Sequence, residues 1–411
     1  MADSLIETWS RRPRSLLASA ACASCLVGCG PGDEVDIGAV GTLDYHGRVE
    51  SIETLGRYTS LDAHLLLQLA THPIEVSVEN DYFLYRVTYP TSGVHGGTTR
   101  VSGLVAIPAT RDIKGVVSWQ HGTNTYRPSS ISKPSIPEGF GVTAMFASDG
   151  FMTVAPDYIG LGVSKEMQGY YHWPSTVSTI VDLLEIAEIM LDGVARSPDR
   201  DLYLAGFSQG GGATAAVQKF LEEQNPTGLS LRGAATISGA FNPRAISFPH
   251  AIASDAPFYL ALLLAAFSYV YERPLDGIVR DPYKDRLLEW FDGTHDKDFL
   301  DEHLPEHVSE LLSDTFMQDF AAGIERPVWL YEALEQAGTY DYAPVAPLRM
   351  FFGSKDDTVI PEEAHAALSH MQALGGNAAA VNVGPYDHDE IVLPSLPPIQ
   401  RWFDRLEGAN Q

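Results

Sequence analysis

The sequence Asp201-Leu-Tyr-Leu-Ala-Gly-Phe-Ser-Gln-Gly-Gly-Gly212 decides how the rest of the chain is interpreted. Residues 202–205 are apolar and predict a short buried strand, whereas residues 211–223 have the composition of a helix. Between them, residues 206–210 follow the pattern Gly-x-Ser-x-Gly, in which a sharp turn exposes one serine hydroxyl. The glycines on both sides remove Cβ atoms that would collide in so tight a turn. We therefore predict that Ser208 is a nucleophile at the start of a helix.

A second segment is expected to supply a backbone N–H group that holds the oxyanion formed when this serine attacks. Residues 115–120 predict a buried strand that runs directly into His121-Gly-Thr123. In a strand-turn-helix architecture of this kind, an oxyanion is held by an amide from such a loop and by the amide after the serine. We assign these two roles to the backbone N–H groups of Thr123 and Gln209. The side chain of His121 is expected to hydrogen-bond within the loop and hold it, not to act as a base.

The acid and the base are expected late in the chain. Residues 347–353 predict a strand that is followed by Asp356 and Asp357, and residues 378–384 predict a final strand that is followed by His388. A serine hydroxyl needs an imidazole to accept its proton and a carboxylate to orient that imidazole. His388 is the predicted base. The spacing from the last glycine of the strand favours Asp356 as the acid, and Asp357 is the alternative.

The alternation of strands and helices predicts the fold class. Residues 82–89 and 99–107 predict an antiparallel hairpin at a sheet edge, and residues 175–191 predict an amphipathic helix before the strand that leads to Ser208. Residues 59–71 predict an N-terminal helix that packs through Leu61, Leu65 and Leu69. Together these segments predict an α/β fold with a mainly parallel sheet flanked by helices.

The regular alternation stops between residues 242 and 343. Residues 257–271 form a nearly unbroken apolar run, and residues 282–320 are acidic and amphipathic. We predict that residues 242–343 are a helical cap or lid inserted over Ser208, and that residues 48–241 and 344–411 form the core. The alternative is a set of packing helices far from the serine.

The N-terminal segment and the composition indicate location and exclude partners. The formal net charge of −26 argues against nucleic acid as a partner. The three cysteines lie between residues 22 and 29, so the body cannot build a disulfide framework or a cysteine metal site. Residues 1–28 resemble an export signal, and the sequence ending at Cys29 is similar to the lipobox of bacterial lipoproteins. That similarity implies lipidation of Cys29, a tether over residues 29–47, and export to a bacterial envelope membrane; the alternative is plain secretion.

The motifs described above together resemble the α/β-hydrolase superfamily. His121-Gly-Thr123 and the loop Asp157-Tyr-Ile-Gly-Leu-Gly162 are also similar to secretory-lipase-type esterases. The Gly-rich loop lacks the spacing and the lysine of a phosphate cradle, so it does not indicate nucleotide binding. The acid loop resembles that of prolyl oligopeptidases, in which the first Asp serves, and this similarity supports Asp356.

The resemblance implies a hydrolase of carboxylic esters that needs no cofactor or metal. The apolar insert suggests a substrate with an apolar acyl chain, such as a small ester or a lipid, and the lipid anchor is the only membrane contact that we expect. Two alternatives remain: a serine peptidase or acyltransferase that uses the same three residues, and a surface binding protein of this fold that has lost catalysis.

Overall fold

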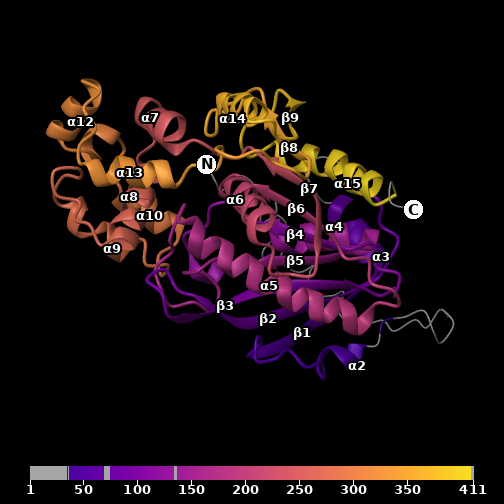
Figure 1. Cartoon of the computed structure of the whole chain (residues 1–411). Coiled ribbons are helices and arrows are strands. Elements are labelled where there is room, and N and C mark those ends of the chain that lie inside the picture. Colours follow the sequence, from indigo (N-terminus) through magenta and orange to yellow (C-terminus); the bar gives the residue numbers. More distant parts are fainter. Residues whose placement is uncertain (1–34, 36, 69–74, 134–136, 409–411) are drawn as a thin grey trace.

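A computed structural model of the protein describes residues 35, 37–68, 75–133 and 137–408 (Figure 1). Within these ranges, one sheet of nine strands has the order β1-β2-β3-β5-β4-β6-β7-β8-β9. Its strands are β1 (Ser51–Tyr58), β2 (Tyr82–Ser92), β3 (Thr98–Pro108), β4 (Val116–Gln120), β5 (Met152–Pro156), β6 (Asp201–Phe207), β7 (Ser230–Ile237), β8 (Leu348–Gly353) and β9 (Ala378–Gly384). Strands β4 to β9 pair in parallel, and β1, β2, β3 and β5 pair antiparallel in that order. The predicted α/β fold with a mainly parallel sheet is therefore confirmed.

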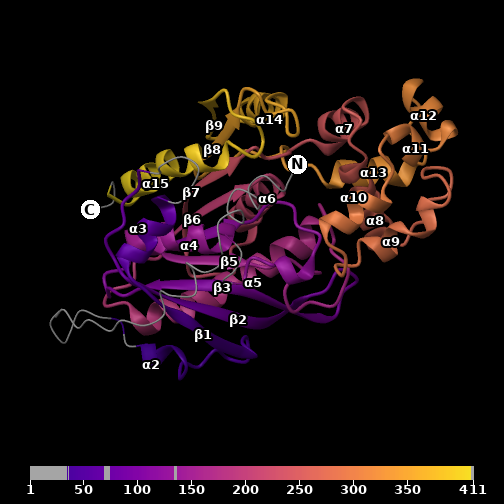
Figure 2. The ribbon, with the colours of Figure 1, turned by 180° about the vertical axis from the view of Figure 1, so that it is seen from behind.

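Helices cover both faces of the sheet because its central strands are buried on both sides. In β6, Leu202 and Leu204 point into one core, and Tyr203 and Ala205 point into the other. The first core is closed by α5 (Trp173–Val194), α6 (Gln209–Gln224) and α14 (Glu362–Ala373), and the second by α3 (Ser60–Gln68), α4 (Pro137–Asp149) and α15 (Val392–Gly408) (Figures 1 and 2). Each large apolar side chain buried in this way contributes about 1.5–3 kcal/mol.

Two local predictions differ from the structure. The hairpin of β2 and β3 does not form the edge, because β1 pairs outside β2. The sequence of β1 carries no apolar alternation, and most of its side chains are exposed or half-buried. The predicted N-terminal helix is present as α3, but its expected packing face is wrong: Leu61 and Leu65 are 62% and 54% exposed, whereas Leu66 and Leu67 are buried. Leu69 lies outside the described residues.

The segment between β7 and β8 is helical and lies at one end of the sheet (Figure 2), where its apolar side chains join the first core. Its elements are η2 (Pro243–Ser247), α7 (Phe248–Ala253), α8 (Pro257–Tyr271), η3 (Tyr283–Asp285), α9 (Leu287–Trp290), α10 (Lys297–His303), α11 (Val308–Leu311), α12 (Asp314–Ala321) and α13 (Val328–Gln336). The chain leaves and re-enters at one place, because the N–H of Thr339 donates to the carbonyl of Phe241 at 2.8 Å. A buried carboxylate, Glu363 of α14, accepts the N–H groups of Phe241 and Asn242 at 2.8 Å each. This segment is called the insert below.

The described part of the tether predicted over residues 29–47 is packed on the body in part. Val35 and Val40 are buried, the N–H of Val35 donates to the carbonyl of Ala109, and α2 (Ile37–Val40) packs against α5. These apolar side chains bury area against the body, which a free tether would leave in water. The predicted signal at residues 1–28 and the predicted lipidation site Cys29 lie outside the described residues. No helix in the described ranges combines the length and the apolar character that crossing a bilayer requires.

Candidate active site

Ser208 occupies a strained turn between β6 and α6. Its backbone has φ 55° and ψ −117°, in the left-handed half of conformational space that an L-residue rarely adopts. The turn is held by the N–H of Ser208, which donates to the carbonyl of Ile237, and by its carbonyl, which accepts the N–H of Gly211. A Cβ at Gly210 would collide with the carbonyl oxygen of Gln120 at the end of β4. Glycine at that position therefore lets α6 begin directly against the neighbouring strand.

Three predicted residues form a hydrogen-bonded chain that starts at this serine. His388 Nε2 lies 2.9 Å from Ser208 Oγ, and His388 Nδ1 lies 2.9 Å from Asp356 Oδ2. The Asp356 side chain is 0% exposed, and its other oxygen accepts the N–H groups of Thr358 and Val359. All three side chains are buried, and they follow strands β6, β8 and β9, which lie on the same side of the sheet order with β7 between the first two. This arrangement can accept a proton from the serine and stabilise the imidazolium that results.

The structure pairs His388 with Asp356, not with Asp357. The Asp357 side chain is exposed, and its backbone carbonyl accepts a hydrogen bond from His250 Nε2 at 2.7 Å. Asp387, which precedes the histidine, turns its carboxylate onto the N–H groups of the two residues that follow His388. Of the two residues considered for the acid, only Asp356 therefore touches the imidazole.

The acid loop and the histidine loop are tied together by the backbone. The N–H of Ser354 donates to the carbonyl of Gly384 at 2.9 Å, and the N–H of Lys355 donates to the carbonyl of Tyr386 at 3.2 Å. These bonds continue the pairing of β8 with β9 beyond the strand ends. The ring of His388 also packs on Phe207, with 4.9 Å between the ring centroids. The triad geometry is thus built mainly from main-chain contacts.

One predicted oxyanion donor follows the serine directly, and the other lies in the loop that packs on Phe207, the residue before the serine. Gln209 begins α6, and Thr123 follows Gly122, whose Cα packs so closely on Phe207 that a Cβ would lie 2.9 Å from its ring. Within the described part of the chain, neither the Thr123 nor the Gln209 N–H donates to another protein group. The start of α6 also points its unpaired N–H groups and its positive dipole end toward Ser208. Both amides are available to hold a negative charge.

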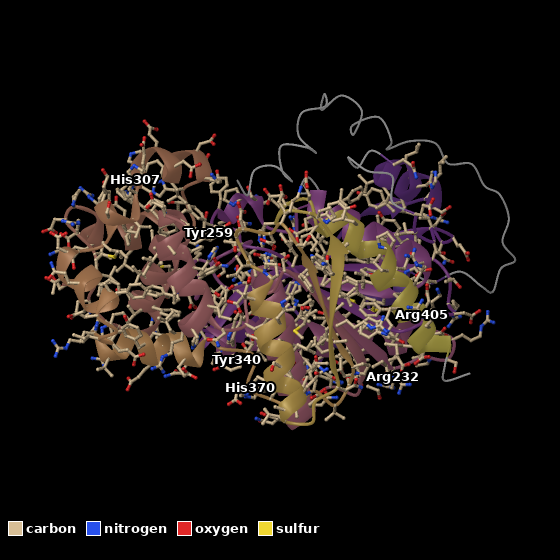
Figure 3. All side chains as sticks on the ribbon, turned by 90° about the horizontal axis from the view of Figure 1, so that it is seen from above. Arg232, Tyr259, His307, Tyr340, His370 and Arg405 are labelled. Atoms are coloured by element: carbon tan, nitrogen blue, oxygen red, sulfur yellow. The ribbon has the colours of Figure 1, made fainter. Side chains whose placement is uncertain are left out.

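The insert reaches the site beside the oxyanion loop. Phe258 and Tyr259 at the start of α8 line a pocket of about 200 Å³ together with Thr123. The other lining residues are Asn124, Thr125, Tyr126, Ser129, Asp296, Lys297 and Asp298. Figure 3 shows Tyr259 where the insert meets the body of the sheet. Burial raises the pKa of the Tyr259 hydroxyl, with smaller contributions from the nearby Tyr170, Asp389 and Asp356, so the hydroxyl remains protonated. The lining is mixed, with three aromatic rings (Tyr126, Phe258 and Tyr259) and several polar groups.

Several residues of the site were not assigned a role from the sequence. Trp119 Nε1 and the N–H of Gly122 both donate to Glu138 Oε1, at 3.0 and 3.3 Å. The hydroxyl of Tyr170 hydrogen-bonds to Thr123 Oγ1 at 3.1 Å, and burial raises its pKa to about 12. Neither Glu138 nor Tyr170 follows a strand or belongs to a known motif, so no sequence signal marks them. No cluster of three or more His, Cys, Asp or Glu able to hold a metal occurs among the described residues.

Comparison with known proteins identifies the family. A family model described as "Serine aminopeptidase, S33" matches residues 140–380, a span that includes Ser208 and Asp356 and ends before His388. No curated protein matches the sequence.

Among solved structures, a protein of Legionella pneumophila, provisionally named a hydrolase, is 25% identical with a TM-score of 0.77, over 88% of this chain and 98% of its own. The rice cell wall degrading esterase LipA from Xanthomonas oryzae is 22% identical with a TM-score of 0.75, over 90% of this chain and 100% of its own. Candida antarctica lipase A in its closed state is 15% identical with a TM-score of 0.64, over 92% and 86%. At 22% and 15% identity, the similarities to LipA and to lipase A show that the folds are alike and nothing more. Because the family model covers more than half of the chain, the protein belongs to the serine aminopeptidase (S33) family of α/β-hydrolases.

Proposed function

We propose that this protein is a serine hydrolase of carboxylic esters, with Ser208 as nucleophile, His388 as general base and acid, and Asp356 as the orienting carboxylate. The observation that carries the proposal is the buried chain from Asp356 through His388 to Ser208, with both hydrogen bonds at 2.9 Å. The strained conformation of Ser208 supports it, because strain of this kind persists where the surrounding structure holds a reactive group in place.

The reaction follows from this geometry. Ser208 Oγ attacks the acyl carbon while its proton moves to His388 Nε2, and Asp356 accepts the Nδ1–H and stabilises the cation. The C–O bond to the alcohol breaks, and His388 returns the proton to the departing oxygen. Water then enters, loses a proton to His388 and attacks the acyl carbon; the C–O bond to Ser208 breaks, the carboxylic acid leaves, and His388 returns the proton to Ser208 Oγ. In the tetrahedral states, the N–H groups of Thr123 and Gln209 hold the oxyanion.

The substrate class is proposed from the insert. The pocket beside Thr123 presents the rings of Phe258 and Tyr259, which suit an apolar acyl or alcohol group. We propose that the insert, residues 242–343, acts as a cap over this pocket. Its single crossing point, held by Glu363, would allow it to fold as a unit.

The location of the enzyme is a further part of the proposal. The segment up to Cys29 supports export, with lipidation at Cys29 and attachment to a bacterial envelope membrane by that anchor, or secretion if cleavage occurs elsewhere. With Val35 bound to the body, the linker between anchor and enzyme would be a few residues long.

A serine aminopeptidase is the second candidate, and the description of the matching family favours it. Asp296 and Asp298 line the pocket and could attract the ammonium group of a free N-terminus. The same triad would then cleave an amide, and its acyl-enzyme could also pass to an acceptor other than water.

The test is a panel of p-nitrophenyl esters of increasing chain length beside aminoacyl p-nitroanilides, on wild type and Ser208→Ala. Esters should turn over faster than anilides, and Ser208→Ala should lose more than about a thousandfold in kcat. Faster anilide turnover would make the protein a peptidase. Ester turnover retained by Ser208→Ala would refute Ser208 as the nucleophile. Absence of ester and anilide turnover in the wild type, together with no labelling of Ser208 by a fluorophosphonate, would favour a binding protein of this fold.

A further inference from the structure

We propose that His121 is a positioning residue that orients the Gly122–Thr123 peptide, whose N–H is the oxyanion donor of the proposed reaction. The inference rests on the proposed function, and it assigns a task to a buried side chain that the triad does not use. Its basis is one hydrogen bond, from His121 Nδ1 to the carbonyl oxygen of Gly122 at 2.7 Å.

The carbonyl of Gly122 and the N–H of Thr123 belong to the same planar peptide unit. The two cis peptide bonds found in the described part of the chain precede Pro282 and Pro327, so this unit is trans. Its carbonyl and N–H therefore point in opposite directions. A hydrogen bond that fixes the carbonyl on the His121 side also fixes the direction of the Thr123 N–H on the other side. It polarises the peptide as well, and this strengthens the N–H as a donor.

The tautomer of His121 follows from its partner. A carbonyl oxygen can only accept, so Nδ1 must carry the proton. His121 is 2% exposed, and burial lowers the pKa of its imidazole to about 4, so the ring is neutral at ordinary pH. Its Nε2 is buried and has no hydrogen-bond partner among the described residues. A neutral ring without a partner at Nε2 is suited to holding one carbonyl and unsuited to relaying protons.

The loop that begins at Asp157 holds His121 in turn. The Tyr158 ring stacks on the imidazole with 4.0 Å between centroids, and its hydroxyl donates to the carbonyl of His121 at 3.1 Å. Asp157, the residue before Tyr158, accepts hydrogen bonds from the hydroxyl of Ser102 and the N–H of Ser132. These two bonds fix the backbone next to Tyr158. The His-Gly-Thr and Asp-Tyr-x-Gly-Leu-Gly segments are thus two halves of one support.

The neighbouring amide is excluded as the donor. The N–H of Gly122 is already directed to Glu138, and the hydroxyl of Thr123 is directed to Tyr170. These two contacts hold the loop on either side of the peptide. The Thr123 N–H is therefore the group whose direction the hydrogen bond from His121 sets.

Three substitutions separate this role from simple packing. In His121→Asn the side-chain amide nitrogen takes the position of Nδ1, so the donor to Gly122 is kept. In His121→Gln the amide nitrogen takes the position of Nε2, and in His121→Leu no donor remains. We would measure kcat and KM on the best p-nitrophenyl ester, the inhibition constant of an alkyl boronic acid that forms a tetrahedral adduct with Ser208, and the thermal midpoint.

His121→Asn should retain kcat/KM within about fivefold of wild type. His121→Gln and His121→Leu should lose about 10- to 100-fold in kcat, with KM within about threefold, because complete loss of an oxyanion donor costs about 10² to 10³. The inhibition constant of the boronic acid should rise by the same factor by which kcat/KM falls, since both quantities report stabilisation of the tetrahedral state. The acid limb of the kcat/KM profile should not move in His121→Asn, because His388 is the base.

A kcat for His121→Gln within threefold of wild type, or equal losses in His121→Asn and His121→Gln with unchanged boronic acid binding, would overturn the proposal. If His121→Leu does not fold, the Asn and Gln variants decide alone. Failure here is distinct from failure of the proposed function, which would appear as ester turnover in Ser208→Ala.

Discussion

Replacing Asp356 by Asn should nearly abolish turnover, for a reason that can be read from its hydrogen bonds. One carboxylate oxygen accepts the N–H groups of Thr358 and Val359, and the other faces His388 Nδ1. In Asp356→Asn the amide oxygen must stay with the two N–H donors. The NH2 group then faces His388 Nδ1 and requires that nitrogen to accept.

The imidazole would then carry its proton on Nε2, the atom that lies 2.9 Å from Ser208 Oγ. In that tautomer His388 cannot accept the serine proton. We expect kcat to fall about 10³- to 10⁴-fold, the size of the effect when the same exchange is made in a serine protease triad. This corresponds to about 4–5.5 kcal/mol in the activation barrier. KM should stay within about threefold, because Asp356 is buried behind the histidine.

The neighbouring Asp357 provides a matched control. Its side chain is exposed, and its structural contact is made by its backbone carbonyl, which Asp357→Asn keeps. Asp357→Asn should change kcat less than about twofold. The assay is steady-state hydrolysis of a p-nitrophenyl ester, with circular dichroism to verify that both variants fold. The reasoning is refuted if Asp357→Asn loses as much as Asp356→Asn, or if Asp356→Asn keeps more than about a tenth of wild-type kcat.

Three further outcomes are expected. Gly210→Ala should destabilise the fold by about 2 kcal/mol or more, measured by urea unfolding, because its Cβ would collide with Gln120. Glu363→Ala should lower the free energy of unfolding by about 2–3 kcal/mol in the same assay, because the buried N–H groups of Phe241 and Asn242 lose their acceptor. The insert should also become more susceptible to proteolysis. Burial lowers the pKa of His121 from 6.5 to about 4, so the unfolded chain binds a proton below pH 6.5 that the folded protein does not. Stability should therefore fall by about 3 kcal/mol as the pH drops from 6.5 to 4, and His121→Asn should lack this loss.

The first two predictions each have a control variant. Gly41 has open space around its Cα, so Gly41→Ala should leave stability unchanged within about 0.5 kcal/mol. Glu362 is exposed beside Glu363, and Glu362→Ala should behave likewise. For the third, a wild-type unfolding free energy that falls no faster with acid than that of His121→Asn would contradict the assignment.

Local sequence was enough for the sheet because its central strands are buried on both faces. A short apolar run such as residues 202–205 is typical of a parallel strand that is covered on both faces. The Gly-x-Ser-x-Gly turn that follows it requires the positive φ that Ser208 adopts. β1 was missed for the opposite reason: its side chains stay largely in water, and backbone pairing with β2 holds it. The packing face of α3 was likewise decided by its neighbour α4, against which Leu66 and Leu67 pack.

The sequence by itself determined the order of the reactive groups and their positions after strands, and parallel strands bring such positions to one edge. It favoured Asp356 over Asp357 by spacing and by resemblance but left Asp357 open, because adjacent residues share their local pattern and differ in which side of the loop faces His388. Nor could it find Glu138 or Tyr170, whose contacts with residues 122–123 join segments far apart in the chain. Those choices belong to the tertiary structure, since a hydrogen bond depends on distance and direction, and these are set by packing rather than by position in the chain.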